Sequence, residues 1–160
     1  MNIREIQPKD NNAIESIIKR SLESFNLNLP GTAYFDPQLG SLAEYYQQHP
    51  NAKYWVAVND NDEVLGGAGI GPFGANADVC ELQKLYLTPA AQGQGIAKQL
   101  MQTALTFAAE HYKFCYLETF QSLEAANTLY LKFGFRQLET PFPDTEHGAC
   151  DAWYVKDLAQ

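Results

Sequence analysis

The feature of this sequence that most directly suggests chemistry is a glycine-rich turn placed just before a helical pattern. The turn is Gln92-Gly93-Gln94-Gly95, and from residue 96 to residue 108 apolar residues recur at helical spacing. The first N–H groups of a helix have no partner inside it and lie at the positive end of its dipole. Glycines let a bulky anion approach those groups closely. The turn therefore predicts a binding site for a phosphate or a pyrophosphate.

Three known classes of phosphate-binding turn can be compared with these residues. A P-loop requires G-x-x-x-x-G-K-[ST], which residues 97–99 do not complete. A dinucleotide-binding turn requires G-x-G-x-x-G after the first strand of its unit, whereas Lys98 replaces the last glycine here. The third pattern, Q/R-x-x-G-x-G/A, is satisfied in full by Gln92-Gly93-Gln94-Gly95-Ile96-Ala97.

Two further blocks accompany the turn: the strand-like ELQKLYL at residues 81–87 and LYLKFGF at residues 129–135. With the three blocks in this order, the chain resembles the GNAT superfamily of acyl-CoA-dependent N-acyltransferases. The resemblance covers essentially the whole chain, more weakly before residue 53 and after residue 140. It implies that the acetyl group of acetyl-CoA moves to a primary amine by direct attack in a ternary complex, with no metal.

The resemblance also implies which residues hold the cofactor. The strand before the turn splays away from its neighbour, and its backbone groups at Leu85, Tyr86 and Leu87 bond the pantetheine arm. The N–H of Leu87 faces the thioester oxygen. By their spacing alone, Leu85 and Leu87 are also consistent with core packing, and both descriptions can hold together. The amides expected to hold the pyrophosphate are those of Gln92, Gly93, Gln94, Gly95, Ile96, Ala97 and Lys98.

Glu81 is the candidate general base. On its own, a glutamate in an apolar strand is equally consistent with a structural ion pair. Glu81 lies eleven residues before Gln92, where several GNAT members place a catalytic glutamate that acts on the amine, often through water. Burial would raise its pKa into a useful range. The alternatives are Glu118, at the end of the next predicted strand, and a water chain.

Tyr130 is the candidate general acid. Helical spacing places it on an apolar stripe, which is typical of a core residue. The L-Y-x-x-x-G-F context, however, resembles the family helix whose tyrosine directs its hydroxyl at the sulfur of CoA. Many relatives have an asparagine seven residues before that tyrosine, where this chain has Leu123. Asn127, one turn before Tyr130, is instead the candidate to bond the pantetheine arm.

The acceptor site is expected to involve the loop after the first helix. That loop contains Tyr34 and Phe35, which are consistent with either substrate recognition or anchoring in the core. Glu118 and His147 are candidates to line the acceptor cleft from the other side. The three histidines share no metal-ligand spacing, so no metal site is predicted. The expected acceptor is an amine on a small molecule or a protein.

Composition narrows the class of protein. The 160 residues suit a single domain spanning residues 1–160. A net charge of −8 argues against nucleic acid or membrane as a partner and favours a cationic amine. Cys80, Cys115 and Cys150 are odd in number and far apart, which indicates reduced thiols and a cytoplasmic protein. The family resemblance allows a homodimer.

The expected fold is α/β, with a mixed, mostly antiparallel central sheet flanked by helices in the GNAT order β-α-α-β-β-β-α-β-α-β-β. Helices are predicted from a cap at Asp10 or Asn12 to about residue 25, with a capping box between Asn12 and Glu15, and over residues 38–48, 95–111 and 122–133. No helix follows the glycines at positions 66, 67, 69, 71 and 74, so they are predicted to mark bulges or close packing within strands and not a second phosphate loop. Strands are predicted at residues 2–6, 53–58, 63–70, 78–87, 113–119, 135–138 and 149–156.

Two other functions remain possible from the sequence. One is a CoA-binding sensor or scaffold that does not turn over, which the presence of both Glu81 and Tyr130 disfavours. The other is dinucleotide binding, which Lys98 and the strand order disfavour. The sequence thus favours an acetyl-CoA-dependent N-acetyltransferase and leaves its acceptor open.

Overall fold

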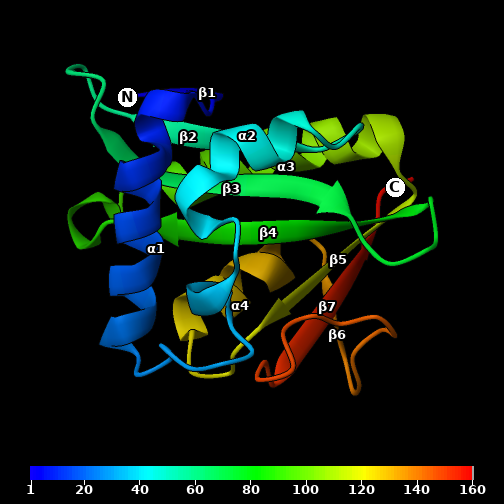
Figure 1. Cartoon of the computed structure of the whole chain (residues 1–160). Coiled ribbons are helices and arrows are strands. Elements are labelled where there is room, and N and C mark those ends of the chain that lie inside the picture. The colour runs from blue at the N-terminus through cyan, green and yellow to red at the C-terminus, as the bar shows by residue number, and fades with distance from the viewer. Residues whose placement is uncertain (160) are drawn as a thin grey trace.

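One seven-stranded sheet organises the molecule in this computed structural model, which describes residues 1–159 (Figure 1). Across the sheet the strands lie in the order β1-β2-β3-β4-β5-β7-β6. Every neighbouring pair is antiparallel except β4 and β5, which are parallel. The predicted fold class is therefore confirmed. The strands are β1 (Asn2–Glu5), β2 (Lys53–Val58), β3 (Val64–Pro72), β4 (Val79–Leu87), β5 (Phe114–Thr119), β6 (Arg136–Leu138) and β7 (Ala152–Asp157).

Four helices cover the two faces of the sheet (Figure 1). On one face lie α1 (Asn11–Ser24) and α2 (Leu42–Gln47), and on the other lie α3 (Ile96–His111) and α4 (Glu124–Lys132). Strand β2 contributes to the cores on both faces of the sheet, because successive side chains of a strand point to opposite faces. Tyr54 and Val56 pack with α1 and α2, whereas Trp55 and Ala57 pack with α3. Within residues 1–159, no helix combines the length and the apolar character needed to cross a bilayer.

Two predicted element boundaries are wrong. The helix predicted over residues 38–48 is interrupted: Leu39–Ser41 form a short 3-10 turn, and α2 begins only at Leu42. Gly40 lies inside that turn, where an added Cβ would come within 3.3 Å of a carboxylate oxygen of Glu15. The last strand begins at Ala152 rather than at residue 149, because the preceding residues form a turn.

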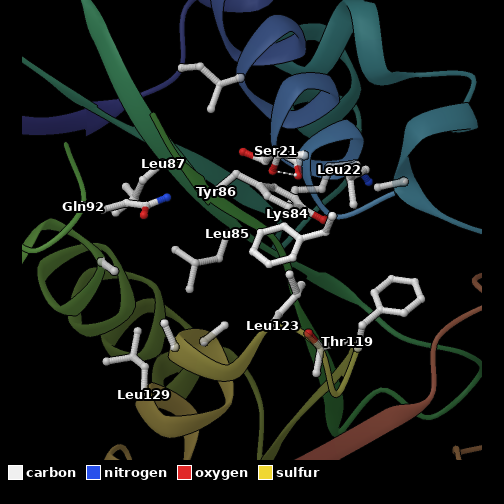
Figure 2. A pocket seen from close by; sticks show the side chains of 18 of the residues that line it. Ser21, Leu22, Lys84, Leu85, Tyr86, Leu87, Gln92, Thr119, Leu123 and Leu129 are labelled. Atoms are coloured by element: carbon white, nitrogen blue, oxygen red, sulfur yellow. Dashed lines mark hydrogen bonds between the residues drawn. The ribbon is translucent and has the colours of Figure 1, made fainter. Parts of the chain in front are cut away.

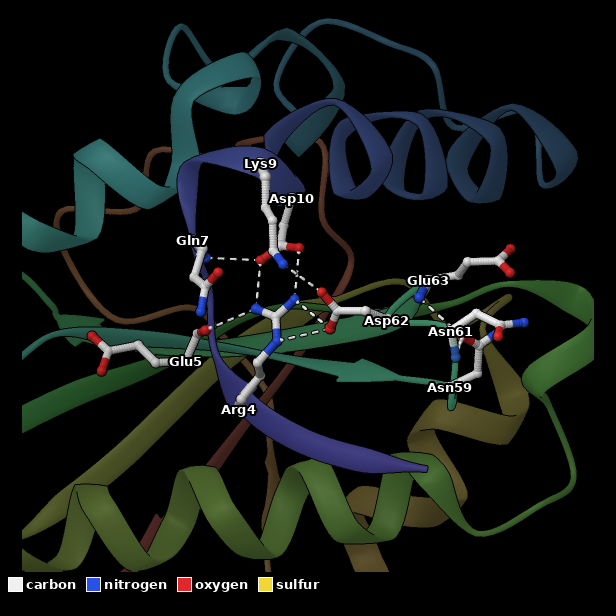
Figure 3. A network of polar contacts seen from close by, with 9 residues as sticks. All are labelled: Arg4, Glu5, Gln7, Lys9, Asp10, Asn59, Asn61, Asp62 and Glu63. Atoms are coloured by element: carbon white, nitrogen blue, oxygen red, sulfur yellow. Dashed lines mark hydrogen bonds and ion pairs between the residues drawn. The ribbon is translucent and has the colours of Figure 1, made fainter.

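The capping box predicted between Asn12 and Glu15 is also wrong. Helix α1 begins at Asn11, so Asn12 lies inside it. Asp10 is the residue before the helix, but its carboxylate does not cap the helix; it bonds Arg4 at 2.7 and 3.0 Å. Arg4 also bonds Asp62 in the turn between β2 and β3, at 3.1 Å (Figure 3). The buried Asp10 thus ties the start of α1 to the edge of the sheet.

The glycines of β3 make room for aromatic side chains, which confirms that they serve close packing. A Cβ on Gly67 would lie 2.5 Å from the ring of Tyr54, and one on Gly69 would lie 2.8 Å from the hydroxyl oxygen of Tyr46. Such distances are shorter than ordinary van der Waals contact. Tyr46 and Tyr54 therefore pack close to the strand, with ring centroids 5.4 Å apart and ring planes inclined at 44°.

A β-bulge in β4 changes the direction of the strand in its middle. The register with β3 shifts there, so that Lys84 and Leu85 both lie opposite Ala68. Lys84 has a φ of +52°, which is unusual for a residue with a side chain. The hydroxyl of Tyr54 donates to the carbonyl oxygen of Lys84 at 2.7 Å. Packing from α2 and β2 thus holds the bulge in place.

The parallel pairing of β4 with β5 is short. It joins Val79 to Phe114, Cys80 to Cys115 and Glu81 to Tyr116, and it ends there. Strand β5 instead pairs with β7 along residues 114–119. The second half of β4 is therefore free of a neighbour on this edge, as the family resemblance predicted.

The close packing over β3 generates a stability prediction. We expect Gly67→Ala to lower the free energy of unfolding by about 1–3 kcal/mol, because the new methyl group overlaps the Tyr54 ring. Urea unfolding followed by circular dichroism measures the change. The matched control is Gly148→Ala, where an added Cβ meets no atom within 4 Å. Equal stability of the two variants would contradict the packing described here.

Candidate active site

The divergence of β4 from β5 opens a cleft of about 740 Å³. Its walls are β4, β5, the second half of α1, the start of α4 and the turn after β4. Figure 2 shows Ser21 of α1, Leu85 of β4, and Leu123 and Leu129 of the α4 segment around this space. The cleft reaches Gln92 and Gly93 at one end and Glu81 at the other. One continuous space thus connects the predicted anion site to the predicted base.

The glycine turn has the geometry of an anion site. Gly93 and Gly95 have φ values of +78° and +79°, and a Cβ on either would meet no atom within 4 Å. Helix α3 begins at Ile96. In the part of the chain that the structure describes, no main-chain N–H of residues 93–98 donates to a protein acceptor. This run of free amides at a helix start can hold a diphosphate.

The edge of β4 presents backbone groups to the cleft. The N–H of Thr88 donates to the carbonyl of Leu65 in β3 at 2.8 Å. Successive residues of a strand direct their N–H groups to opposite edges, so the N–H of Leu87 points away from β3. That direction is the edge from which β5 has diverged. Leu87 can therefore donate to a group bound in the cleft.

Glu81 lies on β4 at the last position paired with β5. The side-chain amide of Gln83 donates to its Oε1 at 2.8 Å, and the hydroxyl of Tyr46 holds Gln83 in turn. Burial, opposed by the amide of Gln83 and aided by the nearby Glu118, raises the pKa of Glu81 to about 7. A carboxyl group with this pKa exchanges its proton near neutral pH.

Glu118 lies beside Glu81 and is held by a different set of groups. The hydroxyl of Tyr116 donates to its Oε2 at 2.8 Å, and the N–H of Phe142 donates to that hydroxyl at 3.1 Å. The other oxygen, Oε1, is buried and has no partner within the described chain. One side-chain atom from each of Glu81, Glu118 and His147 lies within 4.8 Å of the others. The fold thus gathers three groups that no metal-ligand spacing links in the sequence.

Asp36 joins three segments at the same end of the cleft. It accepts from Lys84 Nζ at 2.7 Å and from His147 Nε2 at 2.9 Å. Burial acts to raise the pKa of Asp36, but His147 and Lys84 outweigh it and lower that pKa. Burial acts to lower the pKa of His147, but the bond to Asp36 raises it. These opposing effects indicate an ion-pair cluster that is satisfied internally.

Tyr130 serves both the core and the cleft. Only 6% of its surface is exposed, and its ring packs against Phe135 and Tyr154 with centroids 6.0 and 5.6 Å away. It also lines the cleft. Burial raises the pKa of Tyr130 well above its usual range. Its phenol therefore stays protonated at neutral pH and can donate a proton or a hydrogen bond.

Seven predicted site residues are not among those that line the cleft: Tyr34, Phe35, Gln94, Gly95, Ile96, Lys98 and Asn127. Asn127 donates to the carbonyls of Phe120 and Gln121 at 3.0 and 3.3 Å, while its Oδ1 is buried without a partner in the described residues. Tyr34 donates to Glu23 at 2.8 Å, and Phe35 is 58% exposed. The other predicted site residues do line the cleft: Glu81, Leu85, Tyr86, Leu87, Gln92, Gly93, Ala97, Glu118, Tyr130 and His147.

Sequence reasoning missed Asp36 and Gln83. Gln83 could have been found, because residues two apart in a strand share a face and Glu81 was already a candidate. Asp36 precedes Pro37 and looks like an ordinary turn residue. Its partner His147 is 111 residues away, so no local signal links the two.

Comparisons with known proteins agree with this geometry. A family model described as "Acetyltransferase (GNAT) family" matches residues 18–135. The uncharacterized N-acetyltransferase YjgM of Escherichia coli (strain K12) is 38% identical over 159 residues, covering 98% of this chain and 94% of that protein.

Two solved structures share the fold, and each alignment covers 98% of both chains. One is a GNAT-family acetyltransferase from Staphylococcus aureus Mu50, with a TM-score of 0.84 and 20% identity. The other is the PaiA N-acetyltransferase from Thermoplasma acidophilum in complex with coenzyme A, with a TM-score of 0.74 and 18% identity. The resemblance drawn from the three sequence blocks is confirmed, and the chain belongs to the GNAT family of acetyltransferases.

Proposed function

We propose that this acetyltransferase moves the acetyl group of acetyl-CoA to a primary amine by direct attack within a ternary complex, with Glu81 as base and Tyr130 as acid. The observation that carries the proposal is that both residues line one cleft where β4 and β5 diverge. Glu81 can accept a proton near neutral pH, and Tyr130 keeps its proton there. The two groups thus have complementary acid–base properties.

Acetyl-CoA would extend along the cleft from the glycine turn to Glu81. The free amides of residues 93–98 are suited to its diphosphate. The exposed edge of β4 at Leu85, Tyr86 and Leu87 is suited to the amide groups of the pantetheine arm. Asn127 remains a candidate for that arm only through its Oδ1, because its amide hydrogens already bond carbonyl groups.

The reaction then follows from where the groups lie. Glu81 takes a proton from the bound ammonium, directly or through water. The freed nitrogen attacks the thioester carbon, a C–N bond forms, and the N–H of Leu87 stabilises the oxygen anion. When the C–S bond breaks, its electron pair stays on sulfur and Tyr130 protonates the thiolate. As the tetrahedral intermediate collapses, the nitrogen gives up its second proton, which returns through solvent to the Tyr130 phenolate, and Glu81 then releases its own proton to solvent.

The environment of Cys150 disfavours transfer through an acetylated cysteine. Among the described residues that line the cleft, Cys150 is the one thiol. Cys150 lines the cleft, but burial, with help from Glu118 and Glu81, raises its pKa to about 12. A nucleophilic cysteine requires the opposite shift, because the thiolate is the reactive form. The environment of Cys150 therefore supports direct attack by the amine.

The anion site generates a binding prediction. We expect Gln92→Glu to weaken acetyl-CoA binding about 5- to 20-fold, because a carboxylate beside the diphosphate adds roughly 1 kcal/mol or more of repulsion. Isothermal titration calorimetry measures the dissociation constant. Gln102→Glu, an equal charge change at an exposed position of α3, is the control and should leave binding unchanged. If both variants weakened binding equally, the turn would not be the diphosphate site.

Removal of the proposed acid should affect turnover rather than binding. We expect Tyr130→Phe to lower kcat by about 100-fold or more, the usual contribution of a positioned proton donor. Release of CoA thiol, followed with a chromogenic disulfide in a broad amine screen, measures kcat. Tyr112→Phe is the control, because that hydroxyl bonds the carbonyl of Asn51 at 2.7 Å outside the cleft wall. Tight acetyl-CoA binding with no turnover of any amine by the wild type would instead indicate a sensor.

The ionisation of the proposed base, Glu81, should produce an inflection in the pH profile of kcat/KM. Because the ionised form of Glu81 is the active one, kcat/KM should rise as pH increases through about 7. Glu81→Gln should remove this inflection and lower kcat/KM by about 100-fold or more. Measurement requires an acceptor whose own pKa lies well above the range tested. An unchanged inflection in the variant would assign the base to Glu118 or to water.

A further inference from the structure

The two carboxylates at the end of the cleft are each held by one oxygen and leave the other oxygen free. Gln83 holds Oε1 of Glu81, and Tyr116 holds Oε2 of Glu118. In the described part of the chain, the remaining oxygens accept no hydrogen bond, and that of Glu118 is buried. A buried carboxylate oxygen without a partner is unfavourable. Both carboxylates line the cleft, so the missing donor can come from a ligand there.

The charges at this end do not balance. Three carboxyl groups, those of Glu81, Glu118 and Asp36, face two cationic groups, those of Lys84 and His147. Both cations are already bonded to Asp36. When all five groups are ionised, one negative charge therefore remains. A ligand that carries a single positive charge would neutralise it.

We propose that this end of the cleft is a subsite for the acceptor ammonium, held between Glu118 and Glu81, and that it selects primary amines with no carboxylate on the carbon bearing the nitrogen. The inference rests on the proposed acetyl transfer and specifies its substrate class. Glu118 is the binding residue, and Glu81 is the group to which the ammonium proton passes. Alkylamines, diamines and lysine side chains belong to this class, and α-amino acids do not.

The selection follows from the charges around the acidic pair: in the described residues, no free cation is bonded to Glu118 or Glu81. A carboxylate on the amine carbon would lie within a few ångströms of Glu118 and Glu81, and both would repel it. Lys84 and His147 are engaged by Asp36. The remaining cation of the cleft wall, Arg20, is exposed on α1, and no ion pair joins it to either glutamate in the described residues. An anionic group far from the nitrogen is compatible with this arrangement.

A divalent metal ion fits the same three side chains less well. The Nε2 atom of His147 is already bonded to Asp36, so only its Nδ1 atom would be left for a metal ion. The two positive charges of a divalent metal ion would also exceed the one negative charge that is unbalanced here.

The proposed subsite also accounts for product release, because the acetylated nitrogen is an amide and carries no positive charge for Glu118 to hold.

The test compares two amines that differ only in the carboxylate: n-pentylamine and L-norleucine. With the wild type we expect kcat/KM to be at least about tenfold higher for n-pentylamine. Affinity for the enzyme–CoA complex, measured by calorimetry, should differ in the same direction. L-lysine provides an internal comparison, because mass spectrometry should find the acetyl group on its side-chain nitrogen. These measurements need no variant, so a misfolded mutant cannot obscure them.

Glu118→Gln identifies the residue responsible. This variant keeps the shape of the side chain and should raise KM for n-pentylamine about 10-fold or more, while KM for acetyl-CoA stays unchanged. The ratio of kcat/KM for n-pentylamine to that for L-norleucine should fall. Glu110→Gln, the same charge change at an exposed position of α3, is the control and should alter neither value.

Several results would overturn the proposal. These are equal or better use of L-norleucine, acetylation of L-lysine on its α-nitrogen, no binding of either amine, and an unchanged KM in Glu118→Gln. Zinc binding that excludes n-pentylamine and requires Glu118 would replace the ammonium with a metal ion. Failure here is distinguishable from failure of acetyl transfer itself, because the Tyr130→Phe comparison uses whichever amine is turned over.

Discussion

The termination of the parallel β4–β5 ladder at Glu81 is the constraint on which the rest of the site depends. Beyond it, β4 retains hydrogen bonds to β3 on one edge and leaves its other edge open. The bulge at Lys84 turns the strand at this point, and Tyr54 holds the bulge from behind. The cleft, the exposed N–H of Leu87 and the placement of Glu81 at its inner end all follow from this local loss of pairing.

Burial has different consequences for the acidic and phenolic groups that share the cleft. It raises the pKa of Glu81 into the neutral range, where the group can exchange protons. It raises that of Tyr130 far above the neutral range, where the group only donates. The same low-dielectric environment also keeps Cys150 as a thiol. One physical effect therefore separates the chemical functions of three side chains.

The sequence was sufficient to predict features whose causes are local. The turn at Gln92–Ala97, the helix after it and the strand before it each have a short-range signature, and the structure has all three. Helix 38–48 was mispredicted at its start, where Leu39–Ser41 form a 3-10 turn. Asp36 was missed because its two partners, Lys84 and His147, are distant in the sequence and meet it only in the folded chain.

Asp36 also has a mechanical consequence. Its carboxylate fastens the loop after α1 to the bulge of β4 and to the loop before β7. Two loops that are distant in sequence therefore share one anchor, and neither can swing outward while both bonds persist. Motions of these two loops should therefore be correlated, so that they move as one unit beside the cleft.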